Sequence, residues 1–479
     1  MNSNIKERSI TGFIWKIMEK GGSQIISMLI QIVLARLLLP SDYGIIGYLT
    51  LFINISDVFI QQGLTTALIQ KKDADETDFS SVFFSNIGIA VIIYLIFWGL
   101  SPLVSFFYHE PELTSIMRVL SLSVIIGAVS AVHNAVLAKN LDFKKSFYRG
   151  LSNTISYGVC GIFLAFLGFG VWALVYGRLI GLVVGAITLW LTVDWKPKYK
   201  FSFKRVKRLF NFSSKVLGTN LLNTIFNNVN ALIIGRFYTS ADLGYYQRGQ
   251  NIPQTIMISV DGSMTEVMYP TFSLLQSDLN QLKSAMRRSM KLSMYVVFPI
   301  LIGLFTVSKP LTILLLTEKW LPSVPYMKLT CIICMFWPLS ARIHALNAIG
   351  KSEITFRLSC IGKCISLGFL LIFAQFGVIY IMYGTILTSC ITFFITSYYV
   401  NKYLRYSLVE LLQDICPALI LSMLMGICVV CIGKLECMLF IRLALQVLIG
   451  ITVYILGSII LRIDSFKYIL NYIQMCFRK

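Results

Sequence analysis

The sequence is poor in charge. Only 13% of its 479 residues are Asp, Glu, Lys or Arg, about half the share of a typical soluble protein. No polar stretch is long enough to fold as a soluble domain of its own, whereas 56% of the residues are hydrophobic and the mean hydropathy is +0.74. These values exclude a soluble globular protein and a disordered chain. The 32 glycines have no period, which excludes collagen. We therefore predict an all-α polytopic membrane protein.

Groups that carry chemistry are also scarce. There are three His, and all 11 Cys follow residue 159, mostly inside apolar runs. Cys331 and Cys334 have the spacing of a metal or redox motif but lack the further ligands that zinc requires. Gly350-Lys351-Ser352 lacks the earlier glycine of a phosphate loop. We expect no catalytic residue, no metal and no cofactor, and hence no enzyme.

Long apolar runs dominate what is present. A helix needs roughly 20 apolar residues to cross about 30 Å of hydrocarbon. The sequence contains such runs at residues 11–38, 43–68, 81–106, 113–138, 148–168, 170–193, 210–236, 243–269, 285–308, 323–349, 354–375, 378–400, 413–433 and 439–461. We therefore expect about 14 transmembrane helices.

Basic residues gather in alternate loops. Lys71 and Lys72, the segment 139–149, the segment 196–208 and the segment 283–291 are rich in Lys and Arg, whereas 106–113 and 167–171 have none. Because short cytoplasmic loops collect positive charge, this alternation predicts that both termini are cytoplasmic. Most of the formal charge of +20 then reflects topology. The aromatic and basic segment 195–210 is interpreted as a linker on the anionic inner leaflet, with no nucleic-acid partner.

The sequence contains an internal duplication. ARLLLPSDYG (35–44) returns as GRFYTSADLG (235–244), and FGVWALVYG (169–177) returns as FGVIYIMYG (376–384). A third match pairs Met117, Ser130 and Ala131 with Met327, Ser340 and Ala341. The offsets of 200, 207 and 210 are nearly constant, so spans 1–6 and 7–12 are predicted to be copies.

Each copy has an even number of spans and starts from the same side, which predicts two six-helix lobes related as parallel repeats. The expected domains are an N-terminal lobe (1–193), a basic cytoplasmic linker (194–208), a C-terminal lobe (209–402) and an extra C-terminal helix hairpin with a tail (403–479). We expect a hydrated cleft between the two lobes.

Polar stripes mark the faces that should line such a cleft, because polar groups inside a bilayer are costly unless they face water or protein. The first run carries Lys16, Lys20, Ser23, Gln24, Ser27 and Gln31 at steps of three and four. The seventh carries Asn220, Asn223, Asn227 and Asn230, and the eighth carries Arg248, Asn251 and Gln254. The second run adds Asn54, Asp57 and Gln61.

The motifs ARLLLPSDYGIIGY (35–48), GLTTALIQKKD (63–73) and DLGYYQRGQNIPQ (242–254) carry a resemblance over essentially the whole chain. The sequence resembles the Wzx-type polysaccharide flippases (O-antigen and exopolysaccharide) of the multidrug/oligosaccharidyl-lipid/polysaccharide (MOP) superfamily. One departure is Gln61-Gln62 before Gly63, where related sequences often have an acidic residue.

The resemblance implies a flippase that moves undecaprenyl-diphosphate-linked oligosaccharide across the bacterial inner membrane by alternating access, during surface polysaccharide or lipopolysaccharide biosynthesis. Lys16, Lys20 and Arg248 are the cations expected to bind the diphosphate. Gln24, Asn220, Asn223, Asn227, Asn251 and Gln254 are expected to bind the glycan. Asp57 is the candidate for coupling to H⁺ or Na⁺. Implied partners are membrane lipids, a polysaccharide polymerase and a chain-length regulator, with the transporter itself a monomer.

Three other functions stay open. A cation-coupled multidrug antiporter of the same superfamily would need only twelve spans and an acidic cavity. A peptidoglycan lipid precursor flippase shares the span count and a cationic cavity. A membrane polysaccharide polymerase, the more distant alternative, is disfavoured by the duplication and by the short external loops.

Overall fold

The computed structural model describes residues 22–140 and 142–477, and within these ranges the regular structure is entirely helical. The first described helix spans Gly22–Leu37. The others are α2 (Pro40–Gln62), α3 (Leu64–Gln70), α4 (Glu76–Tyr108), α5 (Leu113–Leu120), α6 (Leu122–Asn140), α7 (Phe143–Phe166), α8 (Val171–Thr192), α9 (Phe203–Phe237), α10 (Ser240–Leu274), α11 (Leu279–Leu316), η1 (Glu318–Ser323), α12 (Val324–Cys334), η2 (Trp337–Ser340), α13 (Ala341–Ala348), α14 (Ser352–Phe373), α15 (Val378–Leu404), α16 (Leu408–Ile432), α17 (Leu439–Ile460) and α18 (Asp464–Phe477).

Every predicted apolar run coincides with helix in the described residues. Ten helical segments there are long and apolar enough to cross a membrane, which makes this a multi-pass membrane protein. The remaining four runs correspond to Gly22–Leu37, α7, α9 and α10. Of these, α9 and α10 are long, but their asparagines, glutamines and charged residues lower the hydropathy. The count of fourteen spans therefore stays a prediction.

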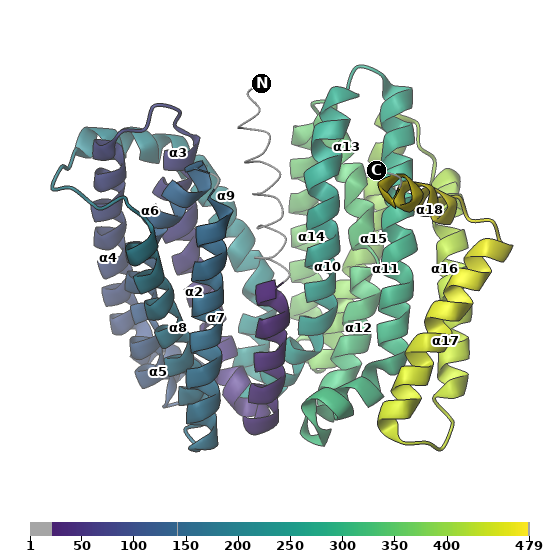
Figure 1. The fold of residues 1–479 in the computed structure, drawn as a ribbon, viewed down its shortest axis with the longest axis horizontal. Helices are drawn as coiled ribbons and strands as arrows, with labels where there is room; N and C mark the ends of the chain where they lie inside the picture. Colours follow the sequence, from purple (N-terminus) through teal and green to yellow (C-terminus); the bar gives the residue numbers. More distant parts are fainter. Residues whose placement is uncertain (1–21, 141, 478–479) are drawn as a thin grey trace. The chain divides into compact units, whose positions relative to one another are not determined.

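The chain forms two compact units, residues 1–244 and residues 245–479. In the first, α4 packs on α6, α7 pairs with α8, and α9 lies against α2, α3 and α4 (Figure 1). The first unit thus contains α9, the leading helix of the second sequence copy. The lobe boundaries expected at 193 and 209 stay predictions.

The duplicated glycines occupy special positions. In the first copy Asp42, third residue of α2, accepts a hydrogen bond from the Leu39 backbone N–H at 2.8 Å. Asp242, third residue of α10, accepts one from the Thr239 hydroxyl at 2.7 Å. Gly44 and Gly244 follow two residues later. Gly170 and Gly377, which correspond to each other in the two copies, have positive φ values of 54° and 133°, a conformation that favours glycine.

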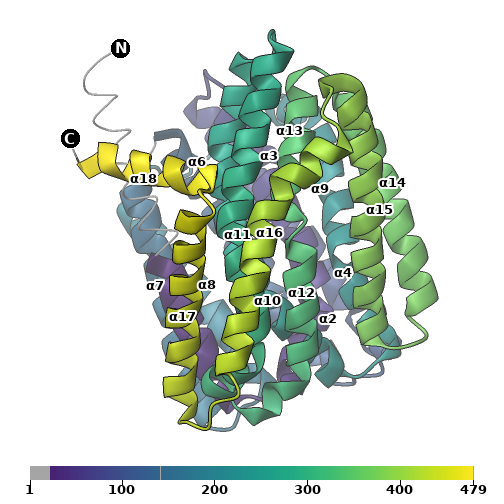
Figure 2. The same ribbon diagram turned by 90° about the vertical axis from the view of Figure 1, so that its right-hand side faces the viewer.

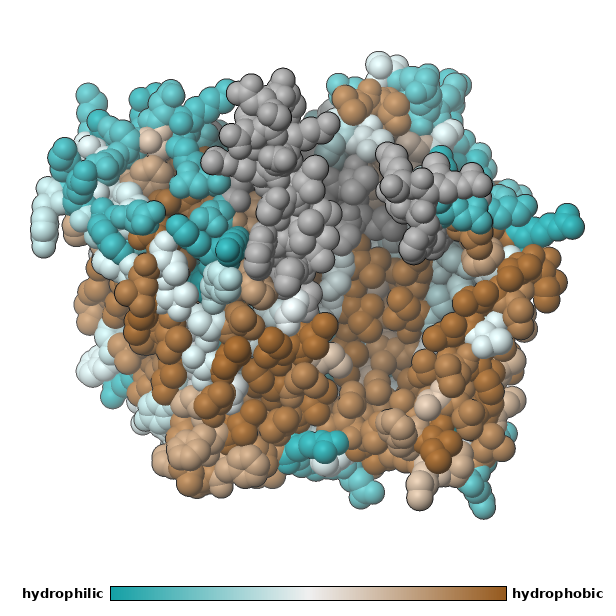
Figure 3. All heavy atoms as spheres, viewed as in Figure 1, coloured by the Kyte–Doolittle hydropathy of each residue, from teal (hydrophilic) through white to brown (hydrophobic). Residues whose placement is uncertain are grey.

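In the second unit, α11 packs against α12, α16 and α17. Its core is rich in methionine, with Met286, Met290 and Met294 fully buried on one face of α11. Figure 2 shows α18 lying crosswise at the end of α17. The outer face of α17 exposes large apolar side chains such as Leu448, Ile451 and Ile455, and the apolar surface in this region is visible in Figure 3. Such a surface suits contact with lipid tails.

An ion cluster joins the C-terminal hairpin to α11. Asp414 on α16 has a side chain only 3% exposed. Arg287 donates to both of its oxygens at 2.7 and 2.8 Å, Lys291 lies 3.0 Å from it, and the Tyr406 hydroxyl donates at 2.8 Å. One turn earlier, Lys283 contacts both oxygens of Glu410 at 2.9 Å. These basic residues therefore attach α16 to α11.

The basic linker is attached to the first unit. The backbone N–H groups of Lys198 and Ser202 each donate to a buried serine hydroxyl at the start of α4, Ser80 and Ser81, at 3.0 Å. Lys198 also pairs with Glu76, and Arg205 with Asp75. The linker is thus fastened at several points along its length.

Candidate polar transport surface

The helix Gly22–Leu37 carries part of the predicted polar stripe. Gln24 is exposed, and Gln31 donates to the Ser27 hydroxyl at 3.2 Å. This side of the helix therefore offers amide and hydroxyl groups. The two predicted lysines, Lys16 and Lys20, lie outside the described residues.

The amide-rich face of α9 belongs to the same unit. Asn227 is exposed, whereas Asn220 and Asn223 are half-buried. Asn228, which lies next to this stripe, accepts a hydrogen bond from the Asn54 amide of α2 at 3.3 Å and donates to the Thr224 carbonyl at 2.8 Å. The structure thus brings together polar residues of the second and seventh predicted spans through Asn228, which the sequence stripe did not include.

Asp57 is an exposed side chain near the end of α2. The Gln61 amide, one turn later, hydrogen-bonds to its carboxylate, and Arg178 of α8 interacts with it electrostatically. Two residues beyond Gln61 the helix breaks at Gly63, where α2 ends and α3 begins.

The predicted site residues of α10 differ from one another in exposure. Arg248 is buried at 8% exposure, and its guanidinium carbon lies 5.8 Å from the ring centroid of Trp320, which is fully buried. Asn251 is exposed and Gln254 half-buried. The arginine is thus a cation packed within the protein, and the two amides that follow at helical spacing lie closer to the surface.

One intramembrane cation was missed by the sequence reasoning. Lys363 lies in the middle of α14, is half-buried and makes a contact with the protein. A charge inside a membrane helix is costly and marks a functional candidate. The signal was present as a single lysine within the apolar run 354–375. Arg342, also intramembrane, is 3% exposed and donates to the Ser397 hydroxyl at 2.6 Å.

In the described part of the chain, a metal ion would need a grouping of several side chains to hold it. No group of three or more His, Cys, Asp or Glu residues there is arranged to hold a metal ion. Cys331 and Cys334 are both 1% exposed in the methionine-rich core, where burial alone accounts for them. The polar surfaces instead offer amides and hydroxyls, which suit hydrogen bonding to a hydroxyl-rich ligand.

A family model described as polysaccharide biosynthesis protein matches residues 33–325. The chain belongs to this family. Its relatives include the succinoglycan biosynthesis transport protein ExoT of Rhizobium meliloti, 23% identical over 74% of this chain and 72% of the relative. The lipopolysaccharide biosynthesis protein WzxC of Escherichia coli is 22% identical over 74% and 73%. The teichuronic acid biosynthesis protein TuaB of Bacillus subtilis is 26% identical over 63% of each chain. The predicted family resemblance is confirmed.

Solved structures share the fold. The lipid II flippase MurJ in an inward closed conformation matches with a TM-score of 0.76 at 16% identity, covering 95% of this chain and 99% of MurJ. An inward-facing multidrug transporter of the MATE family, in the MOP superfamily, matches with a TM-score of 0.64 at 14% identity, covering 81% of this chain. This family member therefore has the fold of MOP-superfamily transporters, and the predicted all-α fold class is confirmed.

Proposed function

We propose that this chain is a flippase that moves a lipid-linked oligosaccharide from the cytoplasmic to the external leaflet of the bacterial inner membrane by alternating access. Membership of the polysaccharide biosynthesis family carries the proposal. The amide-bearing surfaces of Gly22–Leu37, α9 and α10 support it, because a glycan headgroup needs many hydrogen-bonding partners inside the membrane. The carrier lipid is proposed to be undecaprenyl diphosphate, and both termini are proposed to be cytoplasmic.

The role proposed for each residue follows from the chemistry of its side chain. Lys16, Lys20 and Arg248 supply positive charge for the diphosphate, and the amides of Gln24, Asn220, Asn223, Asn227, Asn251 and Gln254 bind the sugars. Asp57 is the proposed coupling site for H⁺ or Na⁺. We propose that the transporter works as a monomer beside a polysaccharide polymerase and a chain-length regulator.

A deletion experiment tests the flippase function. Loss of the gene should abolish surface polysaccharide and cause complete lipid-linked repeat units to accumulate on the cytoplasmic side. Expression of the intact chain should restore the polymer, whereas Asn223→Leu with Asn227→Leu should restore it poorly. Asn401→Leu, at an exposed asparagine near the end of α15, is the matched control. Unpolymerised single repeats at the surface of the deletion strain would instead identify a polymerase.

A second candidate is a flippase for the peptidoglycan lipid precursor. The observation that favours it is the MurJ match over 95% of the chain, against 81% for the MATE transporter. Rescue of a strain depleted of its own precursor flippase would support this candidate. Failure to rescue, together with restored surface polysaccharide in the deletion strain, would support the oligosaccharide flippase.

A further inference from the structure

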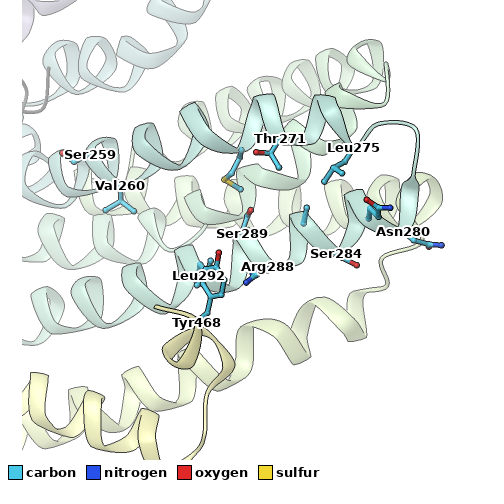
Figure 4. A pocket seen from close by; sticks show the side chains of 13 residues that line it. Ser259, Val260, Thr271, Leu275, Asn280, Ser284, Arg288, Ser289, Leu292 and Tyr468 are labelled. Atoms are coloured by element: carbon cyan, nitrogen blue, oxygen red, sulfur yellow. The ribbon is translucent and has the colours of Figure 1, made fainter. Parts of the chain in front are cut away.

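The second unit contains a groove of about 990 Å³ between α10, α11 and α18. Figure 4 shows its length, from Ser259 and Val260 at one end to Leu275 and Asn280 at the other. The distance from Ser259 to Leu275 along α10 is about 24 Å at 1.5 Å per residue. One leaflet contributes about 15 Å of hydrocarbon. The groove is therefore long enough to hold a lipid chain together with its headgroup.

The lining is divided chemically. Val260, Met268, Leu275, Ala285 and Leu292 provide apolar wall, suited to an acyl or prenyl chain. The polar groups are concentrated on the first half of α11, where Ser284, Arg288 and Ser289 face the groove (Figure 4). An apolar trough with a cation part-way along its length (Figure 4) suits an anionic amphiphile.

Arg288 differs from its basic neighbours on α11. Lys283, Arg287 and Lys291 each form an ion pair with Glu410 or Asp414, whereas Arg288 has no carboxylate within ion-pair distance among the described residues. Its guanidinium carbon lies 3.7 Å from the ring centroid of Tyr468 on α18. Stacking fixes the plane of the guanidinium and leaves its N–H groups available for an anion.

Two serines of α11 also line the groove. Ser284 lies one helical turn before Arg288, and Ser289 is the next residue. A guanidinium with a hydroxyl donor one helical turn away suits a phosphate group, which offers several acceptor oxygens. Arg288 also lies in a segment whose positive charge predicts the cytoplasmic side, the level at which inner-leaflet headgroups lie.

We propose that this groove binds a phosphate-headed lipid of the cytoplasmic leaflet, with the phosphate on Arg288 and Ser284, the chain along α10, and α18 covering the headgroup. The lipid is a bound component of the second unit and is distinct from the transported substrate. The inference is independent of the proposed flippase function, because it concerns only residues of α10, α11 and α18.

Native mass spectrometry of the full-length protein in detergent tests the proposal, with phosphatidylglycerol as the probe. The intact chain should retain one phosphatidylglycerol molecule more tightly than the others. Arg288→Gln should weaken this binding about tenfold, the effect of losing one strong charge-assisted contact. Lys402→Gln, which removes an exposed cation at the end of α15, should leave binding unchanged. Thermal unfolding of both variants checks that they fold.

Two further probes test whether binding depends on both the phosphate and the apolar chains of the lipid. Diglucosyl diacylglycerol, which has the same chains and no phosphate, should bind weakly and should be insensitive to Arg288→Gln. Inorganic phosphate at equal concentration should not displace the lipid, because it cannot use the apolar wall. Equal retention of both lipids, displacement by inorganic phosphate, or equal loss in the Arg288 and Lys402 variants would each overturn the proposal. Tyr468→Ala provides a second variant, in which loss of the stack should weaken binding without removing charge.

Discussion

Gly44 and Gly244, the same position in the two copies of the duplicated motif, pack reciprocally. A Cβ atom on Gly44 would lie 1.7 Å from the carbonyl oxygen of Ser240, the first residue of α10. A Cβ atom on Gly244 would lie 2.0 Å from the carbonyl oxygen of Pro40, the first residue of α2. Each glycine therefore permits the start of the other helix to approach, and the repeated motif has a structural purpose in both copies.

Replacing Gly44 with alanine should destabilise the protein. The obstructing atoms belong to the backbone and cannot rotate away, so the two helix starts must separate at a cost of about 1–3 kcal/mol or more. Thermal unfolding in detergent measures the effect. Gly88→Ala is the matched control, because a Cβ there meets nothing within 4 Å, and it should leave stability equal or slightly raised. Equal behaviour of the two variants would contradict the close contact.

The two glycine substitutions should be less than additive when combined. Either methyl group alone forces the starts of α2 and α10 apart, so the second finds the space already opened. The prediction is checked by comparing the loss of stability in Gly44→Ala with Gly244→Ala against the sum of the single losses. Full additivity would mean that the two glycines report on separate contacts.

Asn54 and Asn228 should show coupling in a double-mutant cycle. Hydrogen bonds between membrane helices contribute about 0.6 kcal/mol on average, and a value of that order is expected for Asn54→Ala with Asn228→Ala. As a control, Asn54→Ala should be additive with Thr452→Ala, since the Thr452 hydroxyl donates to Leu448 within its own helix. A coupling of zero would show that the hydrogen bond between Asn54 and Asn228 contributes nothing to stability.

Asp414→Asn should weaken the attachment of the C-terminal hairpin. Removing a carboxylate that is 3% exposed deprives Lys291 of this counter-charge and leaves Arg287 with Glu410 alone, a loss of no more than about 3 kcal/mol, the lower end of the range for a buried pair. Glu353→Gln, which breaks the exposed pair with Arg357, should cost no more than about 0.5 kcal/mol. Limited proteolysis of the loop before α16, alongside thermal unfolding, distinguishes local release from global destabilisation.

The linker attachment should depend on pH in a defined direction. The hydrogen bond from Arg205, aided by the Asp78 backbone N–H, lowers the pKa of Asp75 from 3.8 to about 2. A depressed pKa in the folded state gives stabilisation that is complete above the unfolded value and is lost as the pH falls through the folded value. The loss of thermal stability in Asp75→Asn should therefore be equal at pH 6 and pH 8 and should shrink below about pH 4. A large difference between pH 6 and pH 8 would contradict this assignment.

Sequence periodicity was sufficient to predict the helices, because apolar runs of membrane length allow little else in lipid. It could also locate the duplicated motif. It could not assign partners. Lys283 and Arg287 were interpreted as topology signals, yet they pair with Glu410 more than 120 residues away. Such pairings depend on which helices are neighbours, and hydropathy carries no information about that.

In the candidate site, too, the sequence predicts which residues are polar but not which residues they contact. The amide stripe of α9 follows directly from helical spacing, but the contact from Asn54 to Asn228 depends on how α2 and α9 are rotated about their axes. Arg248 could be predicted as a ligand-binding cation from its residue type and its place in the polar stripe. Its burial against Trp320 could not be predicted, because it depends on how η1 folds. The sequence also did not predict that α18 lines a groove. This helix follows the last predicted span, and its amphipathic sequence resembles that of an ordinary polar tail.

The packing of α9 has a consequence for any attempt to divide this molecule. Helix α9 is the first helix of the second sequence copy, yet it packs on α2, α3 and α4 in the first compact unit. A break in the basic linker would therefore separate α9 from these three helices and leave an incomplete interface on each fragment. Neither fragment should accumulate alone in the membrane, whereas co-expression should allow them to reassemble. The boundary between the two sequence copies therefore does not coincide with the boundary between the two compact units.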